Sequence, residues 1–329
     1  MLTWPHAATD WAPMLPAAEK TFADIAREIS RRQPLLIVCH DASHRTHVRQ
    51  QLRDNGSNPD KLRWAIAPSN DSWTRDHGPI GVLQDGRPLL LDFRFTGWGG
   101  KYPAELDDRI SRRLHADRVF GATPMETPGL TLEGGAIDSD GRGTLLTTRG
   151  CVANPNRNPG LSAEAIEQAL MDTLGLQRVL WLEHGQLIGD DTDGHVDTLA
   201  RFCDADTIAH VSCDDPADPH HAGLADMAAQ LATFRTAAQR PYRLIPLPLP
   251  APRFNRQGQR LPATYANFLI INGAVLMPSY DDPGDALAKR ALQHAFPRRE
   301  IVTIDCRALI EQFGSLHCVT MQLPRGVLA

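Results

Sequence analysis

The chain has 329 residues, of which 42% are hydrophobic and 22% are charged, and its formal net charge is -5. This composition predicts an ordered globular protein with a sizeable core and excludes an intrinsically disordered chain. No Lys/Arg run dominates any stretch and no apolar run approaches the roughly 18 residues of a membrane span, so neither nucleic acid nor a membrane is expected as a partner.

The start of the chain, MLTWPHAATDW, has neither the basic nor the apolar region of a secretion signal. The six cysteines are scattered and form no CxxC pair. At this density, without a signal, they are expected to be reduced thiols. The predicted compartment is therefore the cytoplasm.

A weak repeat of structure runs along the chain. Pairs of apolar runs separated by turn residues predict hairpins at 76–95, 132–148, 194–213 and 267–280. Apolar periodicity predicts following helices at 162–175, 222–239 and 284–296. Single strands are expected next, at 178–184, 242–249 and 301–305. Each repeat is thus a hairpin, commonly followed by a helix and a lone strand.

The last repeat begins at 317–323 and then the sequence stops. The helical run 21–32 and the apolar run 34–39 can supply the missing helix and strand. Five such units predict an α/β fold built as a closed ring of five blades, with residues 1–329 as a single domain. An ordinary α/β sandwich with mixed strands is the alternative.

Polar residues stand where the first strand of each repeat begins: Asp76, Glu133, His195 with Asp197, Asn267, and Cys318. If the repeats are related by rotation, these residues converge near one axis and form a candidate active site. Solvated strand ends often carry charge, which explains any single position but explains the set of five poorly.

Cys318 and His195 have the side chains for nucleophilic catalysis. A thiol attacks well only when its pKa is lowered or a base is near, and by itself Cys318 is more simply a buried inert thiol. His195 lies among four carboxylates in the segment 190–197, and on a strand His195 and Asp197 would share one face. A divalent metal site is the alternative for this segment, but no second histidine stands at a ligand spacing from His195.

Seven segments together carry a resemblance to a known family. They are WTRDHGP (73–79), FTGWGGKY (95–102), LEGGAIDSDGRGT (132–144), NPNRNPGLS (154–162), TDGHVDTLARF (192–202), NFLIINGAVLMPSY (267–280) and GSLHCVTMQ (314–322). The chain resembles the agmatine deiminases and porphyromonas-type peptidyl-arginine deiminases of the guanidine-modifying pentein superfamily. The resemblance implies a five-bladed α/β propeller with pseudo-fivefold symmetry.

The resemblance also implies the site and its chemistry. Cys318 would be the nucleophile and His195 the general acid and then the general base, with Glu133 orienting and charging His195. Asp76 and Asp197 would grip the guanidinium, as paired carboxylates do with a planar fork of N–H groups. No metal and no organic cofactor are expected, and a homodimer is compatible with the family.

Agmatine is the substrate that this resemblance favours, converted to N-carbamoylputrescine and ammonia. Trp73 and Asp191 are the candidates for binding its distal amine, although Trp73 could equally be core and Asp191 could cap a turn. The stretch Phe313–Leu316 departs from the usual agmatine deiminase pattern, so free arginine and peptidyl-arginine remain alternative substrates. Amidino transfer and a non-catalytic guanidine-binding module are the other readings.

Overall fold

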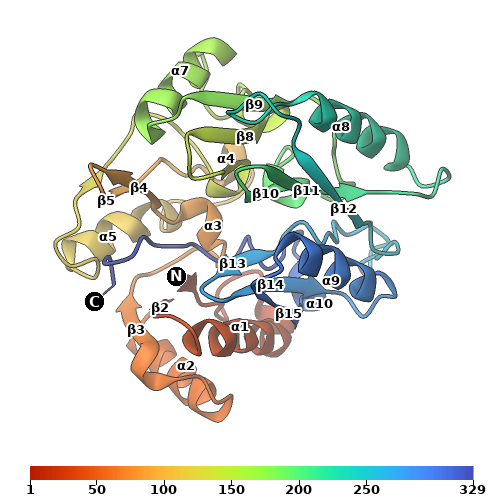
Figure 1. The fold of residues 1–329 in the computed structure, drawn as a ribbon. Coiled ribbons are helices and arrows are strands. Elements are labelled where there is room, and N and C mark those ends of the chain that lie inside the picture. The colour runs from red at the N-terminus through yellow and green to blue at the C-terminus, as the bar shows by residue number, and fades with distance from the viewer. Residues whose placement is uncertain (329) are drawn as a thin grey trace. The chain divides into compact units, whose positions relative to one another are not determined.

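Residues 1–328, which the computed structural model describes, form five three-stranded sheets with helices between their strands (Figure 1). The predicted α/β class is confirmed. The sheets in chain order are β1 (Leu2–Thr3), β2 (Leu35–Cys39) and β3 (Leu62–Ile66); β4 (Ile80–Gln84), β5 (Arg87–Leu91) and β6 (Met125–Glu126); β7 (Ile137–Ser139), β8 (Thr144–Thr148) and β9 (Arg178–Leu182); β10 (Ala200–Asp204), β11 (Thr207–Ser212) and β12 (Arg243–Pro248); and β13 (Leu269–Ile271), β14 (Ala274–Ser279) and β15 (Glu300–Asp305).

Four of the five sheets share one plan. Their first two strands form an antiparallel hairpin, and the third strand pairs in parallel with the second. A parallel partner requires a crossover connection, which a helix supplies. In the last sheet, for example, Leu276 pairs with Leu269 across the hairpin and with Val302 on the parallel side. The predicted hairpins at 76–95, 132–148, 194–213 and 267–280 are confirmed.

Helix α7 (Ala163–Leu174) begins and ends at the residues that the sequence indicates. The Ser162 side chain accepts a hydrogen bond from the Ala165 amide at 3.2 Å, which satisfies one of the free amides at the helix start. Gly175 takes the left-handed conformation, with φ +66°, that commonly ends a helix. Helix α9 (Gly284–Ala295) likewise agrees with its predicted range.

Helix α8 (His221–Thr233) is shorter than the predicted helix at 222–239. The Thr236 amide donates to the Arg240 carbonyl at 2.7 Å, and the Thr236 hydroxyl accepts from the Arg240 amide at 3.2 Å. These bonds close a tight loop after the helix. Alanine-rich periodicity cannot reveal such a loop, because a threonine can bond to the backbone instead of extending the helix.

The first sheet differs from the other four because both of its strand pairs are parallel. The predicted helix at 21–32 overlaps α1 (Leu15–Ser30), which begins earlier and ends two residues sooner. The predicted strand at 34–39 is β2, whereas α2 (Ala42–Asp54) and β3 were not predicted. The predicted strand at 317–323 is irregular. Its residue Met321 nevertheless exchanges two backbone hydrogen bonds with Met1, at 2.7 and 3.1 Å. The segment that ends the chain therefore lies against the strand that begins it.

The chain divides into two compact units, Met1–Gly134 with His317–Ala329, and Gly135–Leu316. A cluster of buried apolar side chains from strands, helix α5 (Ile110–Ala116) and the C-terminal segment forms a core of the first unit. Its members include Leu36, Val38, Leu90, Ile110, Leu114, Phe120, Met321 and Val327. The second unit buries, among others, Ile166, Leu170, Met227, Tyr265, Phe268, Tyr280 and Leu292. The single domain over 1–329 stays a prediction.

No helix within residues 1–328 combines the length and the apolarity that crossing a membrane requires.

Three histidines pack together in the first unit. The ring centroid of His6 lies 4.1 Å from that of His40 and 5.7 Å from that of His44. Each Nδ1 accepts a backbone N–H: His6 from Ala8 at 3.3 Å, His40 from Ser69 at 3.2 Å, and His44 from His40 at 3.1 Å. Protonation would place a hydrogen between each pair of bonded atoms, so this geometry requires neutral imidazoles.

This cluster predicts a specific dependence of stability on pH. Burial, and then His40 and His44, lower the pKa of His6 to about 4, so between pH 6.5 and about 4 the unfolded chain binds a proton that the folded protein does not. The contribution of His6 to the free energy of unfolding is therefore complete above pH 6.5 and falls as the pH drops. Asn at position 6 keeps an acceptor for the Ala8 amide but does not titrate. Between pH 7.5 and 5.0, wild type should lose about 1 kcal/mol relative to His6→Asn.

Urea unfolding of both proteins at the two pH values measures this difference. The comparison with the variant is needed because burial raises the pKa of three carboxyl groups in the same unit: Asp71 and Asp92 to about 6, and Asp107 to about 8. These groups act in the opposite direction, since they stabilise the fold at low pH. Equal pH dependence in wild type and variant would show that the cluster tolerates protonation.

Candidate functional site

The seven predicted site residues are divided between the two units. Trp73, Asp76, Glu133 and Cys318 belong to the first; Asp191, His195 and Asp197 belong to the second. All except Asp191 are buried.

In the first unit, Cys318 lies against the short helix α3 (Thr74–His77) that carries Asp76. The Arg75 amide donates to the Cys318 carbonyl at 3.0 Å. This bond joins two residues that are far apart in the sequence, and it sets the nucleophile candidate beside the residue preceding Asp76. Cys318 itself is 8% exposed.

The Arg75 side chain also holds the segment that contains Cys318. Its guanidinium is buried and donates to the His317 carbonyl at 3.5 Å, to the Met321 sulfur at 3.4 Å and to the Gln322 side-chain oxygen. A planar group with five donors can serve several acceptors at once, which a lysine cannot do. Arg75 therefore fixes an irregular segment that has no strand partners along most of its length.

Replacing Arg75 with lysine is expected to loosen residues 317–322 while leaving the distant strands of the unit intact. The charge is kept, but the fork that reaches three acceptors is lost. Amide hydrogen exchange in this segment should accelerate by about tenfold or more, the equivalent of at least one lost hydrogen bond. Arg63→Lys is a matched control, because the Arg63 side chain is half-exposed and its bonds go to Asp60 and Leu62. Unchanged exchange in 317–322 would contradict this role for Arg75.

Glu133 is also carried close to α3. A Cβ on the next residue, Gly134, would lie 2.2 Å from the Arg75 carbonyl oxygen, so only glycine allows this approach of the two backbones. Glu133 is 1% exposed. The segments of Asp76, Glu133 and Cys318 thus meet around Arg75, in agreement with the expected convergence of strand starts in this unit.

The Gly-aromatic loop at 95–102 supplies a partner for Asp76. The Trp98 indole N–H donates to the Asp76 carboxylate at 3.0 Å. Trp98 lies in the left-handed region with φ +57°, and its ring meets Phe95 and Tyr102 edge-on at 5.1 and 5.5 Å. No local pattern in the sequence identifies Trp98 as the residue that orients this carboxylate.

Trp73 is 6% exposed and its ring packs against that of Trp11 at 5.6 Å. It lies at the start of α3, three residues before Asp76. Its place in the aromatic cluster is the core arrangement that the sequence left open, and its contact with a substrate stays a prediction.

In the second unit, His195 and Asp197 do not lie on a strand. Residues Val196–Thr198 form a 3-10 helix, and β10 begins only at Ala200. The expectation that the two side chains share a strand face is therefore wrong. The Thr198 amide and hydroxyl both donate to the His195 carbonyl, at 3.2 and 2.8 Å, and bend the chain into this turn.

Three sheets of the second unit are joined around this turn. The Asn267 side chain donates to the Asp197 carbonyl at 3.2 Å. Arg201, on β10, donates to Asp138 on β7 at 3.0 Å and to the Phe268 carbonyl at 2.9 Å. Asp197 and Asn267 thus lie next to each other in this unit, and the convergence of all five predicted positions stays a prediction.

Two carboxylates of the loop before His195 bond to other groups of the protein. The Asp190 carboxylate accepts from the Thr192 hydroxyl at 2.6 Å and from the Gly194 amide at 2.7 Å. Asp193 forms an ion pair with Arg157 at 2.5 Å. Asp191 is half-buried on the same loop. Asp190 and Asp193 thus shape the loop through bonds to protein groups.

Cys151, which the sequence did not single out, lies close to His195. Its sulfur and a ring nitrogen of His195 are within 4.8 Å of each other. Among the other cysteines, burial raises the pKa of Cys39 and Cys203 to about 12 and raises that of Cys306 as well. Those three thiols stay protonated and inert at neutral pH, as the sequence predicted.

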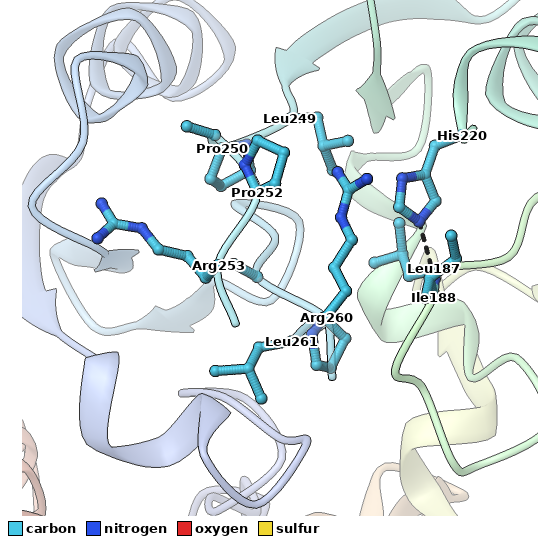
Figure 2. A pocket seen from close by; sticks show the side chains of 12 residues that line it. Leu187, Ile188, His220, Leu249, Pro250, Pro252, Arg253, Arg260 and Leu261 are labelled. Atoms are coloured by element: carbon cyan, nitrogen blue, oxygen red, sulfur yellow. Dashed lines mark hydrogen bonds between the residues drawn. The ribbon is translucent and has the colours of Figure 1, made fainter. Parts of the chain in front are cut away.

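A cavity of about 500 Å³ lies in the second unit beside the loop that precedes His195. Its lining includes Thr148, Gly150, Glu183, Ile188, Asp193 and Gly194. The smaller pocket in Figure 2 shows how the start of the loop is fixed: the His220 Nε2 accepts from the Ile188 amide at 2.8 Å. His220 Nδ1 lies 2.8 Å from the Asp218 carboxylate, which also forms an ion pair with Arg260 at 2.7 Å.

Comparisons with known proteins agree with these features. The family model of the Porphyromonas-type peptidyl-arginine deiminases matches residues 1–324, and the chain belongs to this family. An agmatine deiminase of Pseudomonas aeruginosa (strain LESB58) is 34% identical, over 98% of this chain and 92% of that protein. The predicted family is therefore confirmed.

Two solved structures extend the comparison. A Cys-to-Ser variant of the Campylobacter jejuni agmatine deiminase with substrate bound is 35% identical, with a TM-score of 0.88 over 97% of this chain and 91% of that chain. A provisionally named arginine deiminase from Porphyromonas gingivalis is 50% identical, with a TM-score of 0.91 over 99% of this chain and 95% of that chain. The similarity covers both units.

Proposed function

We propose that this chain is an agmatine deiminase, a hydrolase that converts agmatine and water to N-carbamoylputrescine and ammonia. Full-length similarity to agmatine deiminases supports this function. The observation that carries it is the bond from the Arg75 amide to the Cys318 carbonyl, which sets a thiol beside the helix of a buried carboxylate.

Asp76 and Asp197 are proposed to bind the guanidinium of the substrate. Both side chains are at most 5% exposed, and Trp98 orients the first of them. Charge-assisted bonds from a planar N–H fork to two carboxylates hold the central carbon in one position, so that positioning lowers much of the barrier. Trp73 and Asp191 are the candidates for binding the distal amine of agmatine.

The reaction proceeds in two halves. The Cys318 thiolate attacks the guanidinium carbon, a C–S bond forms, and His195 protonates the departing nitrogen as ammonia. This leaves an S-alkylthiouronium intermediate. His195 then takes a proton from water, the water oxygen attacks the same carbon, and the C–S bond breaks to release the ureido product and the thiolate.

Glu133 is proposed to orient and charge His195. The proposed mechanism involves no metal or organic cofactor. The five sheets are proposed to be the blades of a pseudo-fivefold α/β propeller formed by a single domain. A homodimer and a cytoplasmic location are proposed by analogy with the family.

Ammonia and ureido-product release from agmatine, free arginine and a blocked arginine peptide test the substrate. Agmatine should have a kcat/KM about 100-fold or more above the others, because the site would be built for a distal amine without an α-carboxylate. A preference for arginine or for the peptide would keep the chemistry and overturn the agmatine assignment. If an added amine lowers the yield of ureido product, the amine replaces water as the acceptor, which would instead indicate amidino transfer.

The first alternative is deimination of free arginine. The specific observation in its favour is the 50% identity to the provisionally named arginine deiminase. The same assay separates the two substrates, and binding of all three guanidines without turnover of any would indicate a non-catalytic binding module.

A further inference from the structure

The segment 154–162 carries a buried arginine that the proposed mechanism does not use. The side chain of Arg157 is 1% exposed. Its guanidinium donates to the Asp193 carboxylate at 2.5 Å, to the Thr192 carbonyl at 3.0 Å and to the Asn156 side chain at 2.8 Å. A buried guanidinium is costly to desolvate, so a set of bonds this specific points to a defined task for the charge.

Two of those bonds hold a strained part of the loop before His195. Asp193 is in the left-handed region with φ +69°, a conformation that costs a residue with a Cβ about 1 kcal/mol or more. Gly194 follows with φ +93°, and its carbonyl accepts from the Thr148 hydroxyl at 2.6 Å. The ion pair with Arg157 stabilises Asp193 in a backbone conformation that the free loop would leave.

From this loop, Arg157 reaches His195 along two short paths. The His195 amide donates to the Thr192 hydroxyl at 3.1 Å, and Arg157 holds the carbonyl of that same threonine. In addition, the Cys151 sulfur lies 3.9 Å from the Arg157 guanidinium and within 4.8 Å of a His195 ring nitrogen. One path fixes the backbone of His195 and the other packs a side chain against its ring.

We propose that Arg157 is a positioning residue that fixes the His195 imidazole through Thr192, Asp193 and Cys151. This inference rests on the proposed function insofar as His195 transfers protons to and from the substrate. Arg157 acts on His195 through other residues and is not proposed to contact the substrate. Its loss should therefore lower kcat and leave KM nearly unchanged. A misplacement of about 1 Å in such a group costs roughly 100-fold in rate.

Arg157→Lys and Asp193→Asn test this role from the two sides of the ion pair. Lysine keeps the charge but cannot serve Asp193 and Thr192 together. Asp193 has a side chain 24% exposed, so asparagine there threatens folding less than a change at Arg157. Each variant should lower kcat on agmatine by about 10- to 100-fold with KM within about threefold. The double variant should be little worse than the worse single one, since both break the same contact.

Two measurements distinguish a positioning role from a purely structural one: the pH dependence of kcat and the NMR signal of the His195 ring. A purely structural role would change neither. In both variants the kcat profile should shift, and the ring resonance of His195 should change in position and titration. The NMR measurement needs no turnover. If wild type converts no guanidine, the proposed function fails, while an altered His195 resonance would still support the positioning role.

Arg178→Met serves as the control for a lost arginine in the same unit. The Arg178 side chain bonds to Thr144, the Arg235 carbonyl and Tyr242, none of which belongs to the loop. It should lower the free energy of unfolding without moving the His195 resonance or the pH profile. Normal kcat and an unchanged His195 resonance in Arg157→Lys and Asp193→Asn would overturn the proposal.

Discussion

Cys318→Ala is expected to abolish agmatine turnover, with kcat lowered by at least about 10⁴-fold. In the proposed mechanism the Cys318 thiolate bonds to the guanidinium carbon, and alanine offers no nucleophile in its place. Binding should survive, because Asp76 and Trp98 do not depend on the sulfur for their mutual bond. The dissociation constant of agmatine for the variant, measured by calorimetry, should stay within about tenfold of the wild-type KM.

Acid quenching of wild type during turnover, followed by mass spectrometry, should reveal the thiouronium adduct on the peptide containing Cys318. Cys213→Ala is the matched control, since Cys213 is a partly buried thiol whose sulfur contacts the Asp215 carbonyl. The control should keep its activity and form the adduct. An adduct on another cysteine, or activity retained by Cys318→Ala, would disprove the nucleophile assignment.

His195→Gln is expected to lower kcat by about 10³- to 10⁴-fold, because both proton transfers lose their carrier. Glutamine has a similar size and can accept some of the same hydrogen bonds, but it does not titrate near neutral pH. The decrease in kcat at acidic pH that reports protonation of this histidine should disappear. KM should change little, since the guanidinium is proposed to be held by Asp76 and Asp197.

His294→Gln is the control for this variant, because His294 is exposed in the last turn of α9. It should retain the wild-type rate and pH profile. If His195→Gln keeps a wild-type pH profile, another group carries the protons and the proposed role of His195 fails.

Local signals in the sequence were enough to predict most of the repeated elements. Two apolar runs on either side of Asn272 and Gly273 predicted the hairpin of β13 and β14, and Ser162 with Gly175 predicted both ends of α7. These signals work because the hydrogen bonds they describe join residues that are close in the chain. The same logic failed after Thr233, where the chain leaves the helix at Phe234 and a loop closes between Thr236 and Arg240.

The contacts that shape the candidate site were not predictable in this way. Trp98 bonds to Asp76 and Arg75 holds residues 317–322, yet no spacing in the sequence connects these partners. A 3-10 helix at Val196–Thr198 also stands where a strand was expected, and there Thr198 donates two bonds to the His195 carbonyl. The resemblance to a family supplied the candidate residues, and the folded chain supplied the groups that orient them.

The position of the nucleophile in the chain has a consequence for the order of folding. The second unit is one continuous stretch, Gly135–Leu316, whereas the first needs His317–Ala329 to join residues made at the start. During synthesis the Arg75 guanidinium has no access to the His317 carbonyl or the Met321 sulfur until residues 317–321 have left the ribosome. We therefore expect the continuous unit to fold first and the thiol to enter its site last, so that an incomplete nascent chain cannot react with guanidines.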